Sequence, residues 1–516
     1  MNQSIIFRVF GAVIAILFGL FVIVSALSDG GNSLSKVAIY IIPLLIFGSF
    51  INGQFGVHLL ILGFAYSDLL KRLLVMFGRF SFQDIANVLM LVPLCTLAVS
   101  AHFLIKRFIT GYGKGKKNDL ILALGIGSSC FIALSLVLKF GLGLGVVKEV
   151  AQNAPYGLLI WVVQIAFPDK ATIKKFIRFT VITFIPVALY GIKQHFMGFT
   201  DFEISYLLSG FTTESKHLAE AEIHAFSTMG SSVPFGNVMA ILVGYAMLAF
   251  HISDSGQRKS MPRLLLLLLG LVFLLACYSS SKRSTWFVAT AILIGMFAYR
   301  KKGTTALLYA GAFSAFGMLI IFIEMLLQNW ASISRSVTEI TGFQVGTFSA
   351  RLVGVRNWSR NPDMWTWFGV PVGEQEAAES VSIGTGLTLD KLSNMLAHDM
   401  IGFTLLNYGA LALVVMLLIG TVVLSKLHKS VLSSPDASDR ACLAALLAVM
   451  MGCLFSGLSN AIIFPVNAFG LLTLGLFFRY YYLVQNAAST NSSASTNSSE
   501  SVQDGFDVVE VRGEAA

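Results

Sequence analysis

The sequence is dominated by repeated apolar runs of about 20 residues, the helix length that crosses the roughly 30 Å hydrocarbon layer of a membrane. Only 12% of the 516 residues are charged and 56% are hydrophobic, whereas a water-soluble domain averages about 25% charged residues. Backbone N–H and C=O groups in lipid must form hydrogen bonds within the protein, and an α-helix provides these bonds within one segment. The sequence therefore predicts an all-α polytopic membrane protein.

We expect about 12–14 transmembrane helices, because several of the apolar runs are short for a full crossing. The first run is also too long for the apolar part of a cleavable signal peptide. The candidate spans are 5–27, 36–50, 55–70, 84–105, 120–138, 154–168, 176–196, 234–252, 264–280, 285–299, 304–327, 398–424, 441–459 and 461–483.

The spans define four predicted regions, listed here in order. They are a transmembrane bundle at 1–327 with an external loop at 197–233, a large periplasmic loop with short helices at 328–397, C-terminal transmembrane helices at 398–484, and a disordered cytoplasmic tail at 485–516. The tail is predicted because the hexapeptide Ala-Ser-Thr-Asn-Ser-Ser occurs twice, at 488–499, and an acidic stretch follows. Such polar, low-complexity sequence cannot bury a core.

The net charge of +9 is concentrated in a few short connections. Half of the lysines and arginines lie in five of them: 106–118, 169–178, 253–263, 300–302 and 425–440. By the positive-inside rule these connections face the cytoplasm, where anionic membrane lipid is a sufficient partner and nucleic acid is not needed. With a cytoplasmic N-terminus and 14 crossings, both long loops lie outside. Lys71, Arg72 and Arg79 also fall outside, which is the weakest point of this topology.

The five cysteines all lie within apolar runs without the spacing of metal ligands, and we interpret them as small core residues. The histidines form no metal motif either. We therefore expect no metal and no cofactor.

The stretch from Ser349 to Gly409 contains a polar segment, rich in arginine and tryptophan, that is held between two predicted spans. Long loops of this kind often carry function. Arg351, Arg356 and Arg360 cannot share one helical face, since their offsets scatter by about 140° and 180°, and Arg351 is the preferred candidate. His398 begins the next helix and can accept a proton from a hydroxyl near neutral pH. Asp399 either orients it or caps the helix.

The same loop holds four of the six tryptophans, at 330, 358, 365 and 367. They either form an interfacial aromatic belt or offer flat apolar faces to sugar rings.

Two further motifs lie at the predicted outer boundary. Ser279-Ser-Ser-Lys-Arg-Ser-Thr-Trp286 places Lys282 and Arg283 among hydroxyls, where a guanidinium can hold a phosphate as a bidentate fork or simply snorkel. The loop at 197–233 ends in the Gly- and Ser-rich segment 224–237 before an apolar helix. This segment suits either helix capping or an anion held on free N–H groups.

At these residues the chain resembles the bacterial O-antigen ligase and O-antigen/exopolysaccharide polymerase superfamily. The pattern covers about residues 186–425 in order. Its motifs are Tyr-Gly-x-x-Gln at 190–194, Ala-Phe-Ser-Thr-x-Gly-Ser-x-x-Pro-Phe-Gly at 225–236, Ser-x-Arg-Ser-x-Trp at 281–286, Ala-Arg at 350–351, Trp-Phe-Gly-Val at 367–370, and Ala-His-Asp at 397–399 followed by Leu-Asn-Tyr-Gly-Ala at 406–410.

The resemblance implies a metal-independent glycosyltransferase that uses an undecaprenyl-diphosphate-linked glycan as donor. It places Arg283 on the diphosphate, His398 near the acceptor hydroxyl and Arg351 in support. The chain departs from the pattern in having His224 where members often have arginine, and Asp399 where the usual residue is asparagine. The remaining candidates for substrate binding are Lys282, Gln194 and Arg356.

We therefore expect a polysaccharide polymerase of the bacterial inner membrane with a periplasmic active site, and with a flippase and a chain-length regulator as possible partners. One alternative is a ligase that transfers the glycan to lipid A core or to a protein. A second is a glycan flippase or secondary transporter. Transport would predict internal repeats and ionisable groups at mid-membrane depth, but no repeat is evident, and Glu324 lies near the outer end of its span.

Overall fold

The computed structural model describes residues 44–78, 90–113, 115–140, 144–209, 223–252, 263–301, 420–459 and 465–503, together with residues 414 and 418. All regular structure in these residues is helical, as predicted. The large loop at 328–397 and the first predicted span lie outside the described residues, as do span 304–327 and most of span 398–424.

Five helices in the described part are long and apolar enough to cross a membrane. Their candidate spans are Gly53–Leu73, Leu91–Thr110, Lys170–Met197, Ser232–His251 and Ala437–Ser456.

The described helices, in chain order, are α3 (Gly53–Gly78), α5 (Leu91–Thr110), α6 (Lys116–Phe140), α7 (Leu144–Asn153), η1 (Ala154–Leu158), α8 (Leu159–Ala166), α9 (Lys170–Met197), α10 (Asp201–Leu208), α11 (Ser232–Ile252), α12 (Arg263–Ser279), α13 (Arg283–Ala298), α20 (Ala437–Ser459) and α21 (Val466–Gln503). Residues 44–51 and 420–432 are also helical.

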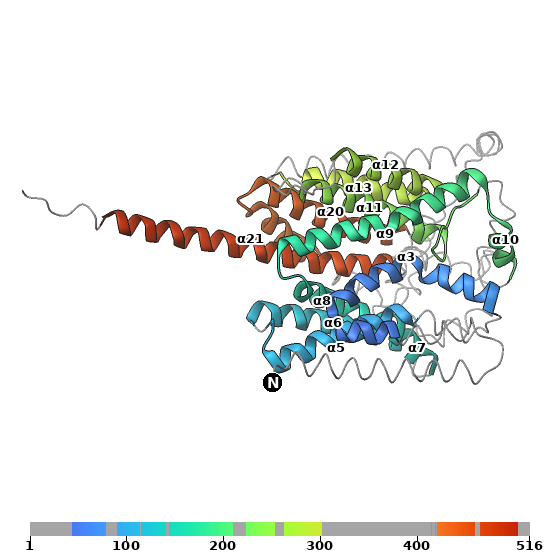
Figure 1. The fold of residues 1–516 in the computed structure, drawn as a ribbon, viewed down its shortest axis with the longest axis horizontal. Helices are drawn as coiled ribbons and strands as arrows, with labels where there is room; N and C mark the ends of the chain where they lie inside the picture. The colour runs from blue at the N-terminus through green and yellow to red at the C-terminus, as the bar shows by residue number, and fades with distance from the viewer. Residues whose placement is uncertain are drawn as a thin grey trace, which may run out of the picture.

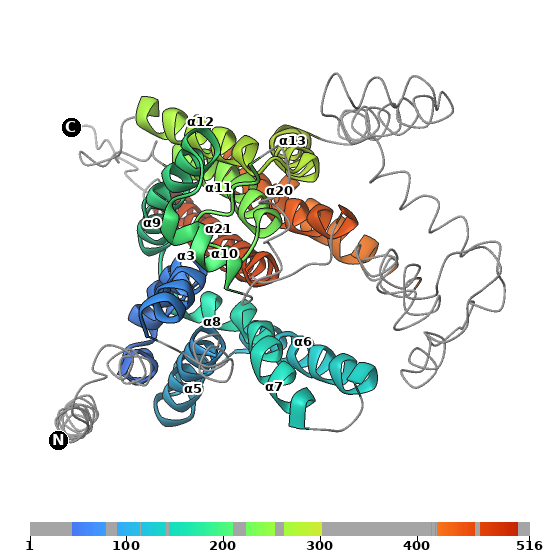
Figure 2. The same cartoon turned by 90° about the vertical axis from the view of Figure 1, so that its right-hand side faces the viewer.

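The helices form one bundle in which α11 packs against α9, α12, α13 and α20. Figure 1 shows α9 running from the end where α21 projects to the end where α10 lies. Seen from the α10 end, α5 to α8 form a group beside this set, and α21 packs against α8 as well as α20 (Figure 2). The bundle is therefore a set of long, roughly parallel or antiparallel helices with two distinct ends.

The interior is centred on Phe469 of α21. Its ring lies 5.2 Å from Phe64 of α3, 5.7 Å from Phe184 of α9 and 6.1 Å from Tyr245 of α11, measured between centroids. Tyr245 and Thr473 share a hydrogen bond of 2.9 Å, so the hydroxyl of this buried tyrosine is satisfied. Four helices that are distant in sequence thus meet at one aromatic cluster.

Basic connections meet at the end of the bundle from which α21 projects, which we call the basic end (Figure 1). Lys170 pairs with Asp439 at 2.8 Å, and Arg479 donates to the carbonyls of Phe167 and Pro168. The other contacts at this end are hydrogen bonds from Tyr112 to Ile165, from Gln164 to Asn118 and from Arg300 to His251, together with an edge-to-face ring contact between Tyr299 and His428. Connections 106–118, 169–178, 300–302 and 425–440 therefore share an end, as the charge pattern predicts. Which membrane face this end occupies remains a prediction.

Several helices differ from their predicted spans, and α5 ends at Thr110 rather than at residue 105. Span 154–168 is only the second half of a longer run, since α7 precedes it and a 3₁₀ turn with Pro155 joins the two. Span 55–70 extends to Gly78, so Lys71 and Arg72 are helical and not in a loop. Span 176–196 starts earlier, at Lys170, because Asp169 and Thr172 form a capping box.

The predicted disordered tail also differs, because α21 continues to Gln503 through both copies of the hexapeptide. No Gly or Pro interrupts this stretch, so the backbone hydrogen bonds continue from the packed part of the helix. Among the cysteines, Cys95, Cys277, Cys442 and Cys453 are buried as predicted, but Cys130 is exposed on α6.

Candidate functional site

The 223–231 segment is the centre of a polar cluster at the end of the bundle opposite the basic end. Its first residues run antiparallel to the turn between α12 and α13. The backbone N–H of Ala225 donates to the carbonyl of Ser279 at 3.2 Å, and the Ser281 hydroxyl donates to the carbonyl of Ile223 at 3.2 Å. Two of the motifs found in the sequence are therefore joined directly by hydrogen bonds.

Gln194, at the end of α9, holds the segment from a second side. Its fully buried side-chain oxygen accepts hydrogen bonds from the backbone N–H groups of Phe226 at 3.1 Å and Ser227 at 2.7 Å. Its amide nitrogen donates to Glu203 of α10. The structure thus gives Gln194 a structural part in positioning the segment, and its contact with substrate remains a prediction.

Glu203 is buried between α9 and α10 and anchors both. Its carboxylate accepts from the backbone N–H of Thr200 at 2.6 Å and from the Thr200 hydroxyl at 2.8 Å, which completes the capping box of α10. Burial acts to raise the pKa of Glu203, but hydrogen bonds from Thr200, Gln194 and Tyr190 outweigh it and hold the pKa below its usual value. Glu203 is therefore a carboxylate near neutral pH.

Arg72 of α3 holds the segment from a third side. Its side chain is 1% exposed, and its guanidinium donates to the backbone carbonyls of Ser227 and Met229. It also lies over the ring of Phe226, with 4.4 Å from the guanidinium carbon to the ring centroid. An arginine inside an apolar bundle requires such partners, and these partners fix the course of the turn.

Hydroxyl groups complete the attachment. Ser227 has a φ of 51°, in the left-handed region, and its hydroxyl donates to the carbonyl of Val187 at 2.5 Å. Tyr66 donates to the carbonyl of Thr183 at 2.8 Å. Both carbonyls flank Pro186, which removes one donor from the hydrogen-bond ladder of α9. The proline therefore lies where two other segments attach to the helix.

Two glycines allow the close packing around the segment. A Cβ atom at Gly191 would lie 2.1 Å from the ring of Phe235, and one at Gly236 would lie 2.4 Å from the Ser280 hydroxyl. Since real Cβ contacts are not that short, α9, α11 and the turn at 279–282 can approach one another only because these positions lack a side chain.

His224 and Lys282 lie next to the hydrogen-bonded pair Ile223 and Ser281, and both are half-buried. Lys282 is the N-cap residue of α13, and Arg283 is the first residue of that helix. The structure thus brings the stretches that carry these three predicted residues together with Gln194. The side chain of Arg283 lies outside the described residues, as do Arg351, Arg356, His398 and Asp399.

An aromatic row borders the turn at 279–282. His195 lies 5.3 Å from Tyr278, and Tyr278 lies 6.2 Å from Trp286, as edge-to-face contacts between ring centroids. Tyr278 and Trp286 are 49% and 40% exposed. Exposed aromatic faces beside a cation suit either a lipid boundary or an apolar sugar face.

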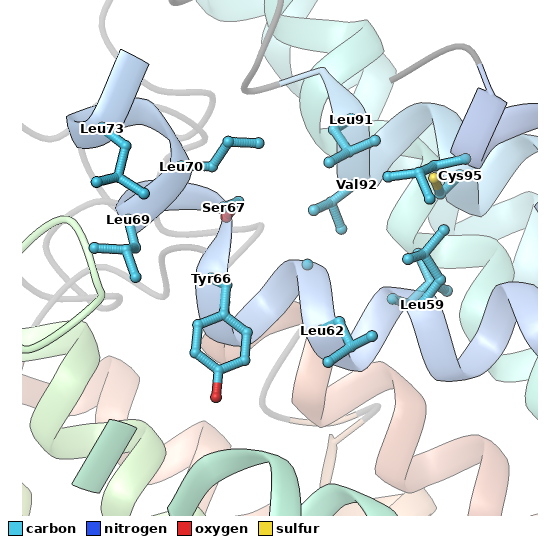
Figure 3. Close-up of a pocket in the computed structure, with 13 residues that line it drawn as sticks. Leu59, Leu62, Tyr66, Ser67, Leu69, Leu70, Leu73, Leu91, Val92 and Cys95 are labelled. Atoms are coloured by element: carbon cyan, nitrogen blue, oxygen red, sulfur yellow. The ribbon is translucent and has the colours of Figure 1, made fainter. Parts of the chain in front are cut away.

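An apolar cavity of about 360 Å³ lies between α3 and α5, outside this cluster (Figure 3). Leucines line most of it, together with Val92, Ser67 and Cys95. Figure 3 shows the Tyr66 ring directed away from Leu70 and Val92. The lining contains no charged group, so the cavity offers nothing for phosphate or proton chemistry.

Arg72 and Glu203 were not among the residues predicted for the site. Thr200 and Glu203 have the spacing of a capping box, which marks a helix start inside the 197–233 loop. Arg72 carried a different signal, since a charge inside an apolar helix requires a buried partner. The charge-based topology places Arg72 in an external loop, which makes this residue one of its weak points.

A search of protein-family models and of curated protein sequences finds no match to this chain. Membership of the O-antigen ligase and polymerase superfamily therefore remains a prediction from the motifs.

Proposed function

We propose that the protein is a membrane-embedded glycosyltransferase that polymerises oligosaccharide repeats linked to undecaprenyl diphosphate at the periplasmic face of the bacterial inner membrane. The observation that supports this proposal is the joining of the 223–231 segment to the turn at 279–282. This contact puts His224, Lys282 and the start of α13 at one end of the bundle, away from the basic end.

In the proposed reaction, the hydroxyl of one lipid-linked repeat attacks the anomeric carbon of another. The bond from that carbon to the diphosphate oxygen breaks as the new glycosidic bond forms, and undecaprenyl diphosphate leaves as an anion. Arg283 and Lys282 neutralise the leaving group, with Arg351 in support. His398 takes the proton of the attacking hydroxyl. The diphosphate already activates the sugar, so the proposal needs no nucleotide.

The first experiment measures polymer growth by purified variants in liposomes supplied with an undecaprenyl-diphosphate-linked oligosaccharide. We expect Arg283→Ala and His398→Ala to lower the rate of chain growth at least about 100-fold, the usual cost of losing a charge-stabilising group or a general base. Arg283→Lys keeps the charge but loses the planar fork, and we expect an intermediate rate.

The matched control is Lys175→Ala, which removes an exposed cation of α9 near the basic end and is expected to leave the rate unchanged. All variants must reach the membrane in equal amount. Normal chain lengths in both alanine variants would refute the proposal. Transfer of finished chains to lipid A core or to a protein, without growth of the chains themselves, would instead support the ligase alternative.

A further inference from the structure

Buried cationic groups gather at the basic end of the bundle, far from the 223–231 segment. Four side chains have buried N–H groups without a hydrogen-bond partner among the described residues. These groups are Nζ of Lys174, Nε and Nη2 of Arg178, Nε of Arg300 and Nε of Arg440. Lys174 is only 6% exposed. Buried charged groups in proteins normally have partners, so this arrangement requires an explanation.

These four side chains, which we call the cation cluster, come from three helix ends at the basic end of the bundle. Lys174 and Arg178 are one turn apart on the same face of α9. The ion pair between Lys170 and Asp439 joins the start of α9 to the start of α20, and Arg300 lies just after α13, which packs against α20. Arg440 directly follows Asp439, the partner of Lys170, in the first turn of α20. The cluster is therefore a shared feature of α9, α20 and the end of α13.

The carboxylate nearest to the cluster is already engaged. Asp439 accepts hydrogen bonds from Lys170 at 2.8 Å and from the Tyr480 hydroxyl at 2.7 Å. Asp169 caps α9 through Thr172, and Asp436 is exposed. Among the described residues, the cluster thus holds four positive charges without a carboxylate of its own.

Two of the guanidinium groups are oriented by contacts that leave their Nε atoms free. Arg300 donates through Nη2 to Nε2 of His251 at 2.6 Å. Because a guanidinium can only donate, this imidazole nitrogen carries no proton. Arg440 donates through Nη2 to the carbonyl of Ser434 at 2.8 Å, while the buried Ser434 hydroxyl has no partner among the described residues. Oriented N–H donors in a region with excess positive charge are the features that an anion-binding site needs.

We infer that the cation cluster binds a phosphate-bearing anion, with the headgroup of an anionic phospholipid as its source. Phosphate oxygens accept in the planar geometry that guanidinium donates, and an ammonium group adds a point charge. The cluster lies at the ends of membrane-spanning helices α9 and α20, at the depth of lipid phosphates if these helices span the bilayer. The inference does not depend on the proposed glycosyl transfer.

The experiment measures the melting temperature of the delipidated full-length protein in a neutral detergent, with and without phosphatidylglycerol or an equal concentration of inorganic phosphate. We expect phosphatidylglycerol to raise the melting temperature of the wild-type protein by at least about 2 °C at saturation, because a ligand of the folded state stabilises it. Lys174→Met and Arg178→Gln should lose this rise. Without lipid, Lys174→Met should be at least as stable as the wild type, since an unpaired buried charge has been removed.

The matched control is Lys175→Met, which removes an exposed lysine one position away on α9 and should keep the full rise. If the melting temperature rises only with phosphatidylglycerol, and the rise depends on Lys174, the ligand is the lipid headgroup. If inorganic phosphate causes the same Lys174-dependent rise, free phosphate is an equal ligand. Equal responses of Lys174→Met and the wild type to both additives would overturn the inference. A Lys174→Met protein that unfolds without lipid would also contradict it.

Discussion

Arg72 illustrates how one side chain can determine the course of a distant part of the chain. The guanidinium on α3 binds two carbonyls of a turn about 155 residues later, and Gln194 on α9 binds two N–H groups of the same turn. Lysine could not replace Arg72 in this role, because a single ammonium does not present two donors in a fixed plane.

We predict that Arg72→Met destabilises the folded protein by about 3–5 kcal/mol, because two buried carbonyls lose charge-assisted hydrogen bonds. Arg72→Lys should recover less than half of this loss. The measurement is the free energy of unfolding, or the melting temperature, in detergent. Lys71→Met is the control, since it removes the neighbouring half-buried cation of α3. If Lys71→Met destabilises as much as Arg72→Met, the hydrogen bonds to the turn are not the cause.

Such residues define the limit of what the sequence reveals about the site. Gln194, His224 and Lys282 were found because they lie in recognisable local motifs, and the structure joins their stretches. Arg72 could not be assigned in the same way, because its partners lie far along the chain and no local pattern specifies which turn an arginine will meet.

At the scale of elements, apolar runs predicted most helices of the described part to within a few residues. Span 264–280 corresponds to Arg263–Ser279 and span 285–299 to Arg283–Ala298. The prediction was poorer where helices begin with lysines or consist of polar residues, as at Lys170 and after residue 485. Hydropathy detects contact with lipid, whereas capping and unbroken backbone hydrogen bonds also determine helix ends.

The stability of the short helix α10 is expected to depend on pH, because its capping carboxylate is buried. The lowered pKa of Glu203 means that its stabilising effect is fully present above the unfolded-state value of about 4.3 and is lost as pH falls through the lower folded value. We predict that the melting temperature falls below about pH 4 in the wild type. In Glu203→Gln this carboxylate-dependent part of the fall is absent, and the protein is already less stable at pH 7.

The measurement is a melting curve at each pH between 3 and 7. Asp201→Asn is the control, because Asp201 is exposed in the same first turn of α10. That variant should keep the wild-type profile. A Glu203→Gln protein with an unchanged profile would show that another group causes the loss of stability in acid.

At the scale of the whole molecule, the bundle separates two kinds of chemistry. Lysines and arginines of four connections meet at one end, while the 223–231 segment and α10 occupy the other. The charge pattern predicted this grouping of connections. It could not predict the cation cluster, which arises only when the folded bundle brings the ends of α9, α13 and α20 to the basic end.

We predict that the two ends lie on opposite faces of the membrane. The test starts from a protein in which the exposed Cys130 is replaced by alanine. One of two cysteines is then introduced at exposed positions, by Ser205→Cys on α10 or Ser433→Cys at the basic end. In sealed membranes that expose the outer face, a membrane-impermeant maleimide should label the first position, and it should label the second only after the membranes are opened. Labelling of both positions under the same condition would exclude this topology.

The threefold anchoring of the 223–231 segment also restricts how any reaction there could be gated. Opening this segment as a lid would break its bonds to α3, to α9 and to the turn at 279–282 together, so it behaves as a fixed wall. If the proposed glycosyl transfer takes place beside this segment, control over substrate entry has to reside in other parts of the chain.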